Sequence, residues 1–272
     1  MKNINWSELG FGYFKTDYNV RCEYKDGKWG ELYATEDVNM NIHMASTCLH
    51  YGQEVFEGLK AFRGADGKVR LFRVEENAKR MINSGEYLKM AVPSVELFTK
   101  ACIEAVKLNA DYIPPYGSGA SLYLRPMLIG VGPQVGVKPS ADYLFAVFVT
   151  PVGPYYKDGF NCIKVIIDYD HDRAAPKGTG HVKVGGNYAA SLDSGEIAHQ
   201  KGFASVIFLD PATKQYIDEC SAANFFGIRD GKYITPDSHS VLPSITNKSL
   251  RQIAEDLGLK VEQRKVGVEE LP

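Results

Sequence analysis

A lysine stands within a glycine-rich segment, GHVKVGGNY, at residues 180–188. Glycine has no side chain, so a flat ligand could approach Lys183 closely, and a desolvated amine loses basicity and becomes a nucleophile. Lys183 is therefore a candidate for Schiff-base chemistry. The segment alone leaves open a second interpretation, a solvated surface lysine in a glycine-rich turn, because lysines are rarely buried without a partner.

A lysine Schiff base is useful mainly with an electron sink such as pyridoxal phosphate, which also needs an anion cradle and an acid facing its ring nitrogen. Glu219 precedes a run of small residues along which a ring could lie, and an ionised carboxylate there would keep the nitrogen protonated. Thr246 stands near the start of an expected helix, where backbone N–H groups bind anions. Arg80 could supply a bidentate guanidinium. Each residue also has a simpler interpretation: a strand-end glutamate, a helix cap and a solvent-facing arginine.

The pattern of apolar residues and turn residues predicts the elements that position these side chains. Residues 1–150 read as a small α+β domain, and the breaker-rich residues 151–159 as a linker. Within the first domain we expect hairpins at 24–29 and 62–71, helices over 75–90 and 95–108, and strands over 121–129 and 143–149. In residues 160–272 we expect strands at 163–168, 204–209, 215–217, 224–228 and 260–264, with helices at 187–201 and 249–257.

Composition narrows the class of protein. The 272 residues carry a formal net charge of -2 and 44% hydrophobic residues, which favours small-molecule substrates and gives no basic footprint for nucleic acid. The apolar runs are too short to cross a membrane, and the N-terminus lacks the apolar core of a secretory signal, so we expect a cytoplasmic protein. The five cysteines are scattered, which indicates reduced thiols and no metal site.

Five segments together resemble the fold-type-IV pyridoxal-phosphate transaminases, and most closely the branched-chain amino acid aminotransferases. In family order they are residues 49–62 (LHYGQEVFEGLKAF), 70–73 (RLFR) followed by Asn77 and Arg80, 121–126 (SLYLRP), 183–188 (KVGGNY) and 219–224 (ECSAAN). Any one of them would be weak evidence, but five in the family's order are strong. The resemblance implies an α/β, two-domain fold: a small α+β domain followed by a larger, pseudo-barrel-like cofactor domain.

The resemblance also implies a role for each matching residue. Lys183 would form the Schiff base with pyridoxal 5'-phosphate, Tyr188 would bind its phenolic oxygen, and Glu219 would pair with its ring nitrogen. Its phosphate would be held by Arg80, Ile245 and Thr246. The substrate pocket would be lined by Phe11, Tyr51, Phe56, Tyr123 and Arg125, and in a homodimer Val135 and Tyr155 would cover the pocket of the neighbouring subunit.

The implied activity is ping-pong transamination of leucine, isoleucine and valine with 2-oxoglutarate, which gives branched 2-oxoacids and glutamate. Lys183 would be both tether and acid/base. One pocket must accept aliphatic and carboxylate side chains, which suits apolar walls with one arginine at the edge. Two enzyme alternatives of the same fold type are a D-amino acid transaminase and an aminodeoxychorismate lyase, and a third alternative is a non-catalytic binding or scaffold protein.

The resemblance also predicts a departure after Pro272, because family members continue there for several tens of residues. That part of the family supplies a Gly-Thr-Ala turn whose backbone N–H groups bind the substrate carboxylate. The cofactor domain is therefore expected to be incomplete relative to the family. A polypeptide that ended at Pro272 would be expected to retain cofactor weakly and to have low activity.

Overall fold

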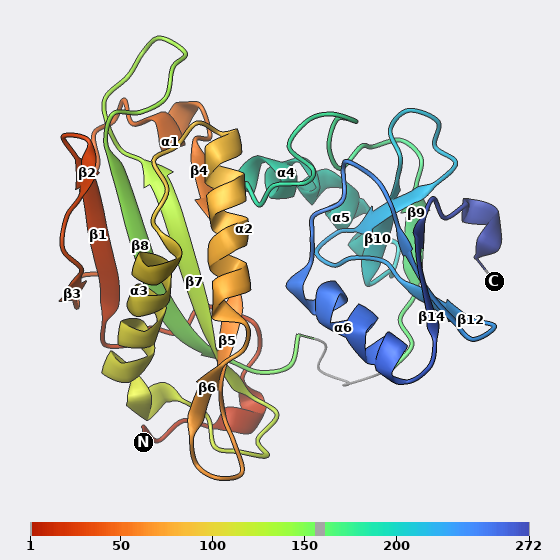
Figure 1. Ribbon diagram of the computed structural model, residues 1–272, viewed down its shortest axis with the longest axis horizontal. Coiled ribbons are helices and arrows are strands. Elements are labelled where there is room, and N and C mark those ends of the chain that lie inside the picture. The colour runs from red at the N-terminus through yellow and green to blue at the C-terminus, as the bar shows by residue number, and fades with distance from the viewer. Residues whose placement is uncertain (1, 156–160, 272) are drawn as a thin grey trace. The chain divides into compact units, whose positions relative to one another are not determined.

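The computed structural model describes residues 2–155 and 161–271 (Figure 1). The chain forms two compact units, Met1–Asn161 and Cys162–Pro272, of which the second is the shorter. The expected linker, residues 151–159, falls partly on residues 156–160, which lie outside the described residues.

The first unit is built on an antiparallel sheet of eight strands, in the order β2-β1-β8-β7-β5-β6, with β3 paired to β1 and β4 paired to β7. The strands are β1 (Asn19–Lys25), β2 (Lys28–Trp29), β3 (Tyr33–Thr35), β4 (Glu54–Phe56), β5 (Leu59–Arg63), β6 (Val69–Leu71), β7 (Ser121–Gly130) and β8 (Tyr143–Val152). The helices are η1 (Trp6–Glu8), α1 (Thr47–His50), α2 (Val74–Tyr87), α3 (Val95–Leu108) and η2 (Ala110–Tyr112). Both expected hairpins form, as β1–β2 and β5–β6.

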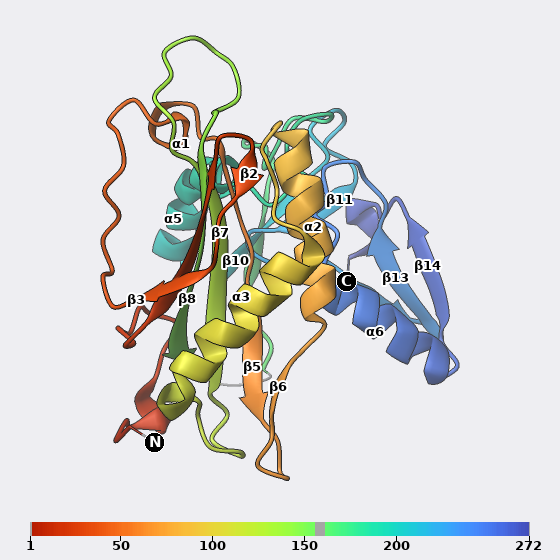
Figure 2. The ribbon, with the colours of Figure 1, turned by 60° about the vertical axis from the view of Figure 1, so that its left-hand side comes forward.

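Helices α2 and α3 cover one face of this sheet (Figures 1 and 2). The buried stripe of α3 consists of Phe98, Ala101, Cys102, Ala105 and Val106, which recur at helical spacing. Phe98 stacks on Phe145 of β8 with ring centroids 5.8 Å apart. Successive side chains of a strand point to opposite faces of the sheet, and this alternation determines which side chains of β7 enter the core.

Strand β7 buries Leu122, Leu124 and Leu128, whereas Tyr123 and Arg125 are half-buried and point to the opposite side of the pleat. The sheet thus presents these two expected pocket residues on the face that the helices do not cover. Strand β8 continues to Val152, two residues into the expected linker. Pro151 is tolerated there because β1 pairs with β8 only between Tyr143 and Val147.

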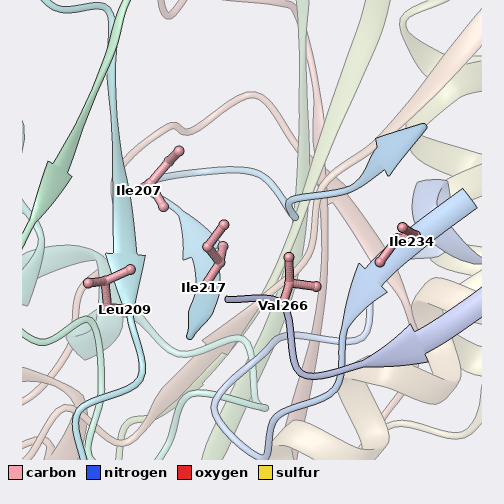
Figure 3. Close-up of a cluster of buried hydrophobic side chains, with 5 residues drawn as sticks. All are labelled: Ile207, Leu209, Ile217, Ile234 and Val266. Atoms are coloured by element: carbon pink, nitrogen blue, oxygen red, sulfur yellow. The ribbon is translucent and has the colours of Figure 1, made fainter. Parts of the chain in front are cut away.

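The second unit contains two sheets of three strands each. One has the order β11-β10-β9, from β9 (Val165–Asp168), β10 (Ser205–Leu209) and β11 (Ile217–Cys220), and the other has the order β12-β13-β14, from β12 (Gly227–Arg229), β13 (Lys232–Pro236) and β14 (Lys260–Arg264). Its helices are α4 (Gly185–Ala190), α5 (Leu192–Gln200), α6 (Ile245–Asp256) and the short η3 (Val268–Glu270). A cluster of buried aliphatic side chains joins the two sheets: Ile207, Leu209, Ile217, Ile234 and Val266 (Figure 3).

The observed elements of this unit differ from the expected ones in several places. Residues 187–201 form two helices, because Ser191 donates its hydroxyl to the carbonyl of Tyr188 and ends the first one. Helix α6 begins at Ile245, four residues before the expected start, because the Ser244 side chain caps it through the backbone N–H of Asn247. Strand β13, which pairs with both β12 and β14, was not expected at all.

Candidate active site

Lys183 lies in the second unit, just before α4, and its amine is paired with a phenol. Its Nζ atom donates to the hydroxyl of Tyr188 over 2.6 Å and lies 4.9 Å from the centre of that ring. Both side chains are half-buried. The sequence spacing explains the contact, since a residue that precedes a helix by two positions lies beside the first turn of that helix.

A buried amide holds this lysine segment in place. The Nδ2 atom of Asn187 donates to the carbonyls of Thr179 at 2.7 Å and Val182 at 3.0 Å, and its Oδ1 atom accepts from the Thr179 hydroxyl at 2.6 Å. A fully satisfied buried amide favours one conformation of the loop. Gly186 is exposed at the start of α4, and a Cβ atom added there would meet nothing within 4 Å.

Glu219 is a deeply buried carboxylate, with 5% of its surface exposed. Its Oε1 atom accepts from Asn224 Nδ2 at 2.9 Å, and its Oε2 atom accepts from the backbone N–H of Leu242 at 3.1 Å. Oε2 also accepts from the guanidinium of Arg173. Glu219 is therefore desolvated, and it is not a solvated strand-end residue.

Two opposing effects act on the Glu219 carboxyl. Burial raises its pKa, while the charge of Arg173, the N–H of Leu242, the amide of Asn224 and the charge of Lys183 each lower it. The net direction is upward. Lys183 is close enough for its charge to act on Glu219, which places the predicted cofactor lysine and the predicted ring-nitrogen acid in one region of the second unit.

The N-terminus of α6 belongs to the same region. Asn224 Nδ2, which binds Glu219, also donates to the carbonyl of Leu242 at 3.0 Å, and Asn247 Nδ2 donates to Asn224 Oδ1 at 3.2 Å. Ile245 is the first residue of the helix and Thr246, which is exposed, is the second. Their backbone N–H groups are among those that a helix leaves without intrahelical partners. This end of the site can accept an anion such as a phosphate.

In the first unit, Arg80 of α2 forms a two-point ion pair with Glu57. The Nε and Nη2 atoms of Arg80 lie 2.7 and 2.8 Å from the two carboxylate oxygens, and Asn77 donates to the same carboxylate at 2.7 Å. Glu57 is fully buried and the Arg80 side chain is 12% exposed. The pair fixes the direction of the guanidinium.

Five of the expected substrate-pocket residues come together in the first unit. The Arg125 guanidinium donates to the Tyr123 hydroxyl at 3.0 Å and lies 4.8 Å from the centre of the Phe56 ring. Phe11 packs edge-on against Tyr123 and Tyr155, with centroids 5.1 and 5.4 Å away. Tyr155 thus lies against residues of its own chain.

The other two expected pocket residues contact each other. The Tyr51 hydroxyl donates to the backbone carbonyl of Val135, whose side chain is 81% exposed. The Tyr51 side chain is itself largely exposed. Tyr51 and Val135 therefore form a solvent-facing pair within the first unit.

Sequence reasoning missed three residues that build these sites: Glu57, Arg173 and Asn224. Glu57 stands within the first resembling motif, and an acidic residue in an otherwise apolar segment could have signalled a buried ion pair with an arginine. Asn224 ends the Glu219 motif. Arg173 lies in a segment without a recognisable pattern, so no local signal identified it.

Comparisons with known proteins show the family of this chain. The Amino-transferase class IV family matches residues 54–272. A branched-chain-amino-acid aminotransferase of Haemophilus influenzae is 52% identical over all of this chain and 81% of its own length, and one of Helicobacter pylori (strain J99) is likewise 52% identical with the same coverage. The chain belongs to the class IV aminotransferase family.

Solved structures of class IV aminotransferases give the same result for the fold. A branched-chain amino acid aminotransferase from Escherichia coli matches with a TM-score of 0.73 and 28% identity, over 94% of this chain and 79% of that one. The T.th. enzyme in complex with N-(5'-phosphopyridoxyl)-L-glutamate matches with a TM-score of 0.74 and 28% identity, over 95% of this chain and 80% of that one. The expected fold class, enzyme class and resemblance to branched-chain aminotransferases are confirmed.

The residues of this class IV aminotransferase also fit the cofactor that the sequence predicted. The second unit holds an amine hydrogen-bonded to a phenol, a buried carboxylate and a capped helix N-terminus, which match the aldehyde, ring nitrogen and phosphate of pyridoxal phosphate.

Among residues 2–155 and 161–271, no helix is both long and apolar enough to cross a bilayer.

Proposed function

We propose that this chain transfers the amino group of leucine, isoleucine or valine to 2-oxoglutarate, with pyridoxal 5'-phosphate as its cofactor. The observation that carries the proposal is the 2.6 Å contact between Lys183 Nζ and the Tyr188 hydroxyl, in a region that also contains buried Glu219. Two of its sequence relatives, each 52% identical, are branched-chain aminotransferases. Solved structures of the T.th. relative carry pyridoxamine 5'-phosphate and 4-methylvaleric acid, a branched aliphatic acid.

When bound, pyridoxal phosphate supplies an electron sink for the negative charge that develops at the substrate Cα. Lys183 anchors the cofactor and its amine moves the proton at Cα, as general base and then as general acid. The Tyr188 hydroxyl orients Lys183 Nζ and binds the phenolic oxygen. Glu219 pairs with the ring nitrogen, and its desolvation makes that electrostatic interaction stronger than it would be in water.

The phosphate contacts are assigned separately for each unit. In the second unit, the backbone N–H groups of Ile245 and Thr246 and the Thr246 hydroxyl bind the phosphate at the start of α6. In the first unit, Arg80 contributes a guanidinium that Glu57 holds in a fixed orientation. A preorganised guanidinium loses less side-chain entropy when it binds a phosphate.

The substrate side chain is assigned to the cluster around Arg125 in the first unit. Phe11, Phe56 and Tyr155 offer aromatic surface to a branched aliphatic group, and Arg125 offers a cation to the carboxylate of glutamate. Within the described residues, Arg125 contacts Tyr123 and Phe56 and has no carboxylate partner. A half-buried guanidinium that has no carboxylate partner favours an anionic ligand.

We also propose that the protein acts as a cytoplasmic homodimer. Val135 is expected to cover the pocket of the neighbouring subunit, and the hydrogen bond from Tyr51 makes that tyrosine part of the same surface. Tyr155, which lies against Phe11, can line the pocket of its own chain. Sedimentation of the protein, with and without substitution of Val135 by aspartate, tests the dimer: the wild type should sediment as a dimer and the variant should dissociate more readily.

A substrate panel tests the activity itself. Purified protein is loaded with pyridoxal phosphate and supplied with 2-oxoglutarate and leucine, isoleucine, valine or D-alanine, and separately with aminodeoxychorismate. We expect glutamate to form with the three branched L-amino acids. A preference for D-alanine or aminodeoxychorismate would contradict the proposal, and the absence of any visible absorbance band after cofactor addition would favour a non-catalytic protein.

A further inference from the structure

Arg173 is a buried arginine in the second unit that has no role in the function proposed so far. Its side chain is 8% exposed. The Nη2 atom donates to the carbonyls of Gly180 at 2.9 Å and Ser240 at 2.7 Å, and to Glu219 Oε2. One nitrogen thus joins the lysine segment, the segment before α6 and the buried carboxylate.

A second nitrogen of the guanidinium is not hydrogen-bonded within the described part of the chain. Arg173 Nε is buried and has no hydrogen-bond partner among the described residues. An unsatisfied buried donor lowers stability, so an arginine is an unfavourable way to connect two backbone carbonyls. The positive charge of Arg173, and not its hydrogen bonds to the backbone, is therefore the property that explains an arginine at this position.

Two cations act on the Glu219 carboxyl. The charges of Arg173 and Lys183 both lower its pKa, and the effect of Arg173 is the larger. The nitrogen of Lys183 is committed to the cofactor in the proposed function. Neighbouring Asp218 is also buried, with a raised pKa, and the Cys220 thiol has its pKa raised by burial and by Glu219. Arg173 is therefore the permanent counter-charge at this position.

We propose that Arg173 is a positioning residue that keeps Glu219 ionised and fixes the direction of its carboxylate toward the cofactor ring nitrogen. A buried carboxyl without a counter-charge takes up a proton instead of remaining charged. A neutral Glu219 would no longer hold the ring nitrogen protonated, and the electron sink would weaken. The catalytic part of this inference rests on the proposed assignment of Glu219, whereas the charge pairing can be tested in the apoprotein.

The first experiment is a double-mutant cycle on the apoprotein, with Arg173→Met, Glu219→Gln and the double variant, followed by urea unfolding at pH 7 and pH 5. Removing one partner of a buried pair is strongly destabilising, so Arg173→Met should raise the unfolding equilibrium constant by roughly 100-fold or more at pH 7. In the Glu219→Gln background the same change should have an effect of less than about tenfold, because no buried anion is left uncompensated.

The pH dependence gives an independent result. At pH 5 a larger fraction of Glu219 is protonated in the variant, so the loss caused by Arg173→Met should shrink. A matched control is Lys214→Met, which removes the cation from the partly exposed pair with Asp172 and should be insensitive to Glu219→Gln. Equal, pH-independent losses in both Glu219 backgrounds would show that Arg173 only connects backbone segments, and would overturn the proposal.

Failure of Arg173→Met to fold is also informative. If the double variant folds when Arg173→Met does not, the uncompensated carboxylate is the cause and the proposal is supported. If neither folds, the backbone bridge is what the protein requires and the proposal fails. Arg173→Lys keeps the charge without the fork geometry, and it should retain the pH profile of the wild type.

The second experiment uses the holoenzyme and separates this inference from the proposed function. With pyridoxal phosphate bound, Arg173→Met should slow the single-turnover reaction with leucine, while borohydride should still attach the cofactor to Lys183. Arg173→Lys should recover most of the rate. If the wild type itself shows no attachment at Lys183, the proposed function fails while the apoprotein cycle still decides the pairing of Arg173 with Glu219. An unchanged rate in Arg173→Met would contradict the catalytic part of the inference.

Discussion

Replacing Arg125 by methionine should separate the two kinds of substrate that this aminotransferase must accept. The guanidinium lies 4.8 and 5.3 Å from the centres of the Phe56 and Tyr123 rings, and the Tyr123 hydroxyl accepts from its Nε and Nη2 atoms at 3.3 and 3.0 Å. Methionine keeps apolar bulk on the same face of β7 but removes the charge and every donor. Only a substrate with a side-chain carboxylate should lose a strong interaction.

The expected size of the loss follows from the chemistry of that contact. A hydrogen bond to a charged group contributes about 1.5–3 kcal/mol, so kcat/KM for glutamate should fall about 10- to 150-fold. Leucine makes no ion pair with Arg125, and its kcat/KM should change by less than about threefold, corresponding to about 0.7 kcal/mol. The ratio of the two specificity constants is therefore the sensitive quantity.

The assay is a single-turnover reaction of the pyridoxal-phosphate form with glutamate or leucine, followed through the cofactor absorbance. Arg125→Lys is the matched control: it retains a cation but not the planar fork, so its loss with glutamate should be smaller than that of methionine. An equal loss with both substrates would mean that Arg125 maintains the pocket structure. No loss with glutamate would refute its assignment as the carboxylate-binding residue.

Three other substitutions test separate contacts of the same structure. Gly58→Ala would place a Cβ atom against the Tyr123 hydroxyl, which must move. Because Arg125 donates to that hydroxyl, kcat/KM for glutamate should fall by about tenfold. A Tyr123→Phe variant that shows no such fall would contradict this explanation. Glu57→Gln removes the buried carboxylate that pairs with the Arg80 guanidinium and should cost about 3–5 kcal/mol in urea unfolding, whereas an effect below about 1 kcal/mol would show that the pair is solvated. The pKa of Glu270 is lowered from 4.5 to about 2, chiefly by its arginine partner on β14. Glu270→Gln should therefore lose ~0.2–1 kcal/mol of stability at pH 7, and this difference from the wild type should vanish as the pH falls from 4.5 toward 2. Unfolding at pH 7 and pH 3 measures the change, and a constant difference would exclude the ion pair as its cause.

Sequence reasoning reached the residues whose chemistry is local. Lys183 could be singled out from its own segment, a lysine among glycines. Tyr188 was implied only by the family resemblance, and the last helix was expected to start four residues too late. Helix α3 was predicted with its observed bounds, because its buried residues follow helical spacing without interruption. Strong periodicity and local caps are the signals that a single sequence carries best.

What escaped prediction depends on contacts between distant segments. Glu57 and Arg80 are 23 positions apart and Arg173 and Glu219 are 46 positions apart, so the local sequence around one residue does not identify its partner. The break between α4 and α5 depends on one serine hydroxyl that competes for a helical carbonyl. Tertiary pairing of this kind decides which charged residues are buried, and it is visible only in the folded chain.

The central claim is that Lys183 is the residue that carries the cofactor. The decisive measurement is to reduce the pyridoxal-phosphate-loaded protein with sodium borohydride, digest it, and locate the modified lysine by mass spectrometry. We predict a single modified peptide that contains Lys183 and that disappears in Lys183→Ala, while Lys177→Ala leaves it in place. Modification of another lysine in the wild type, or transaminase turnover by Lys183→Ala at the wild-type rate, would contradict the claim.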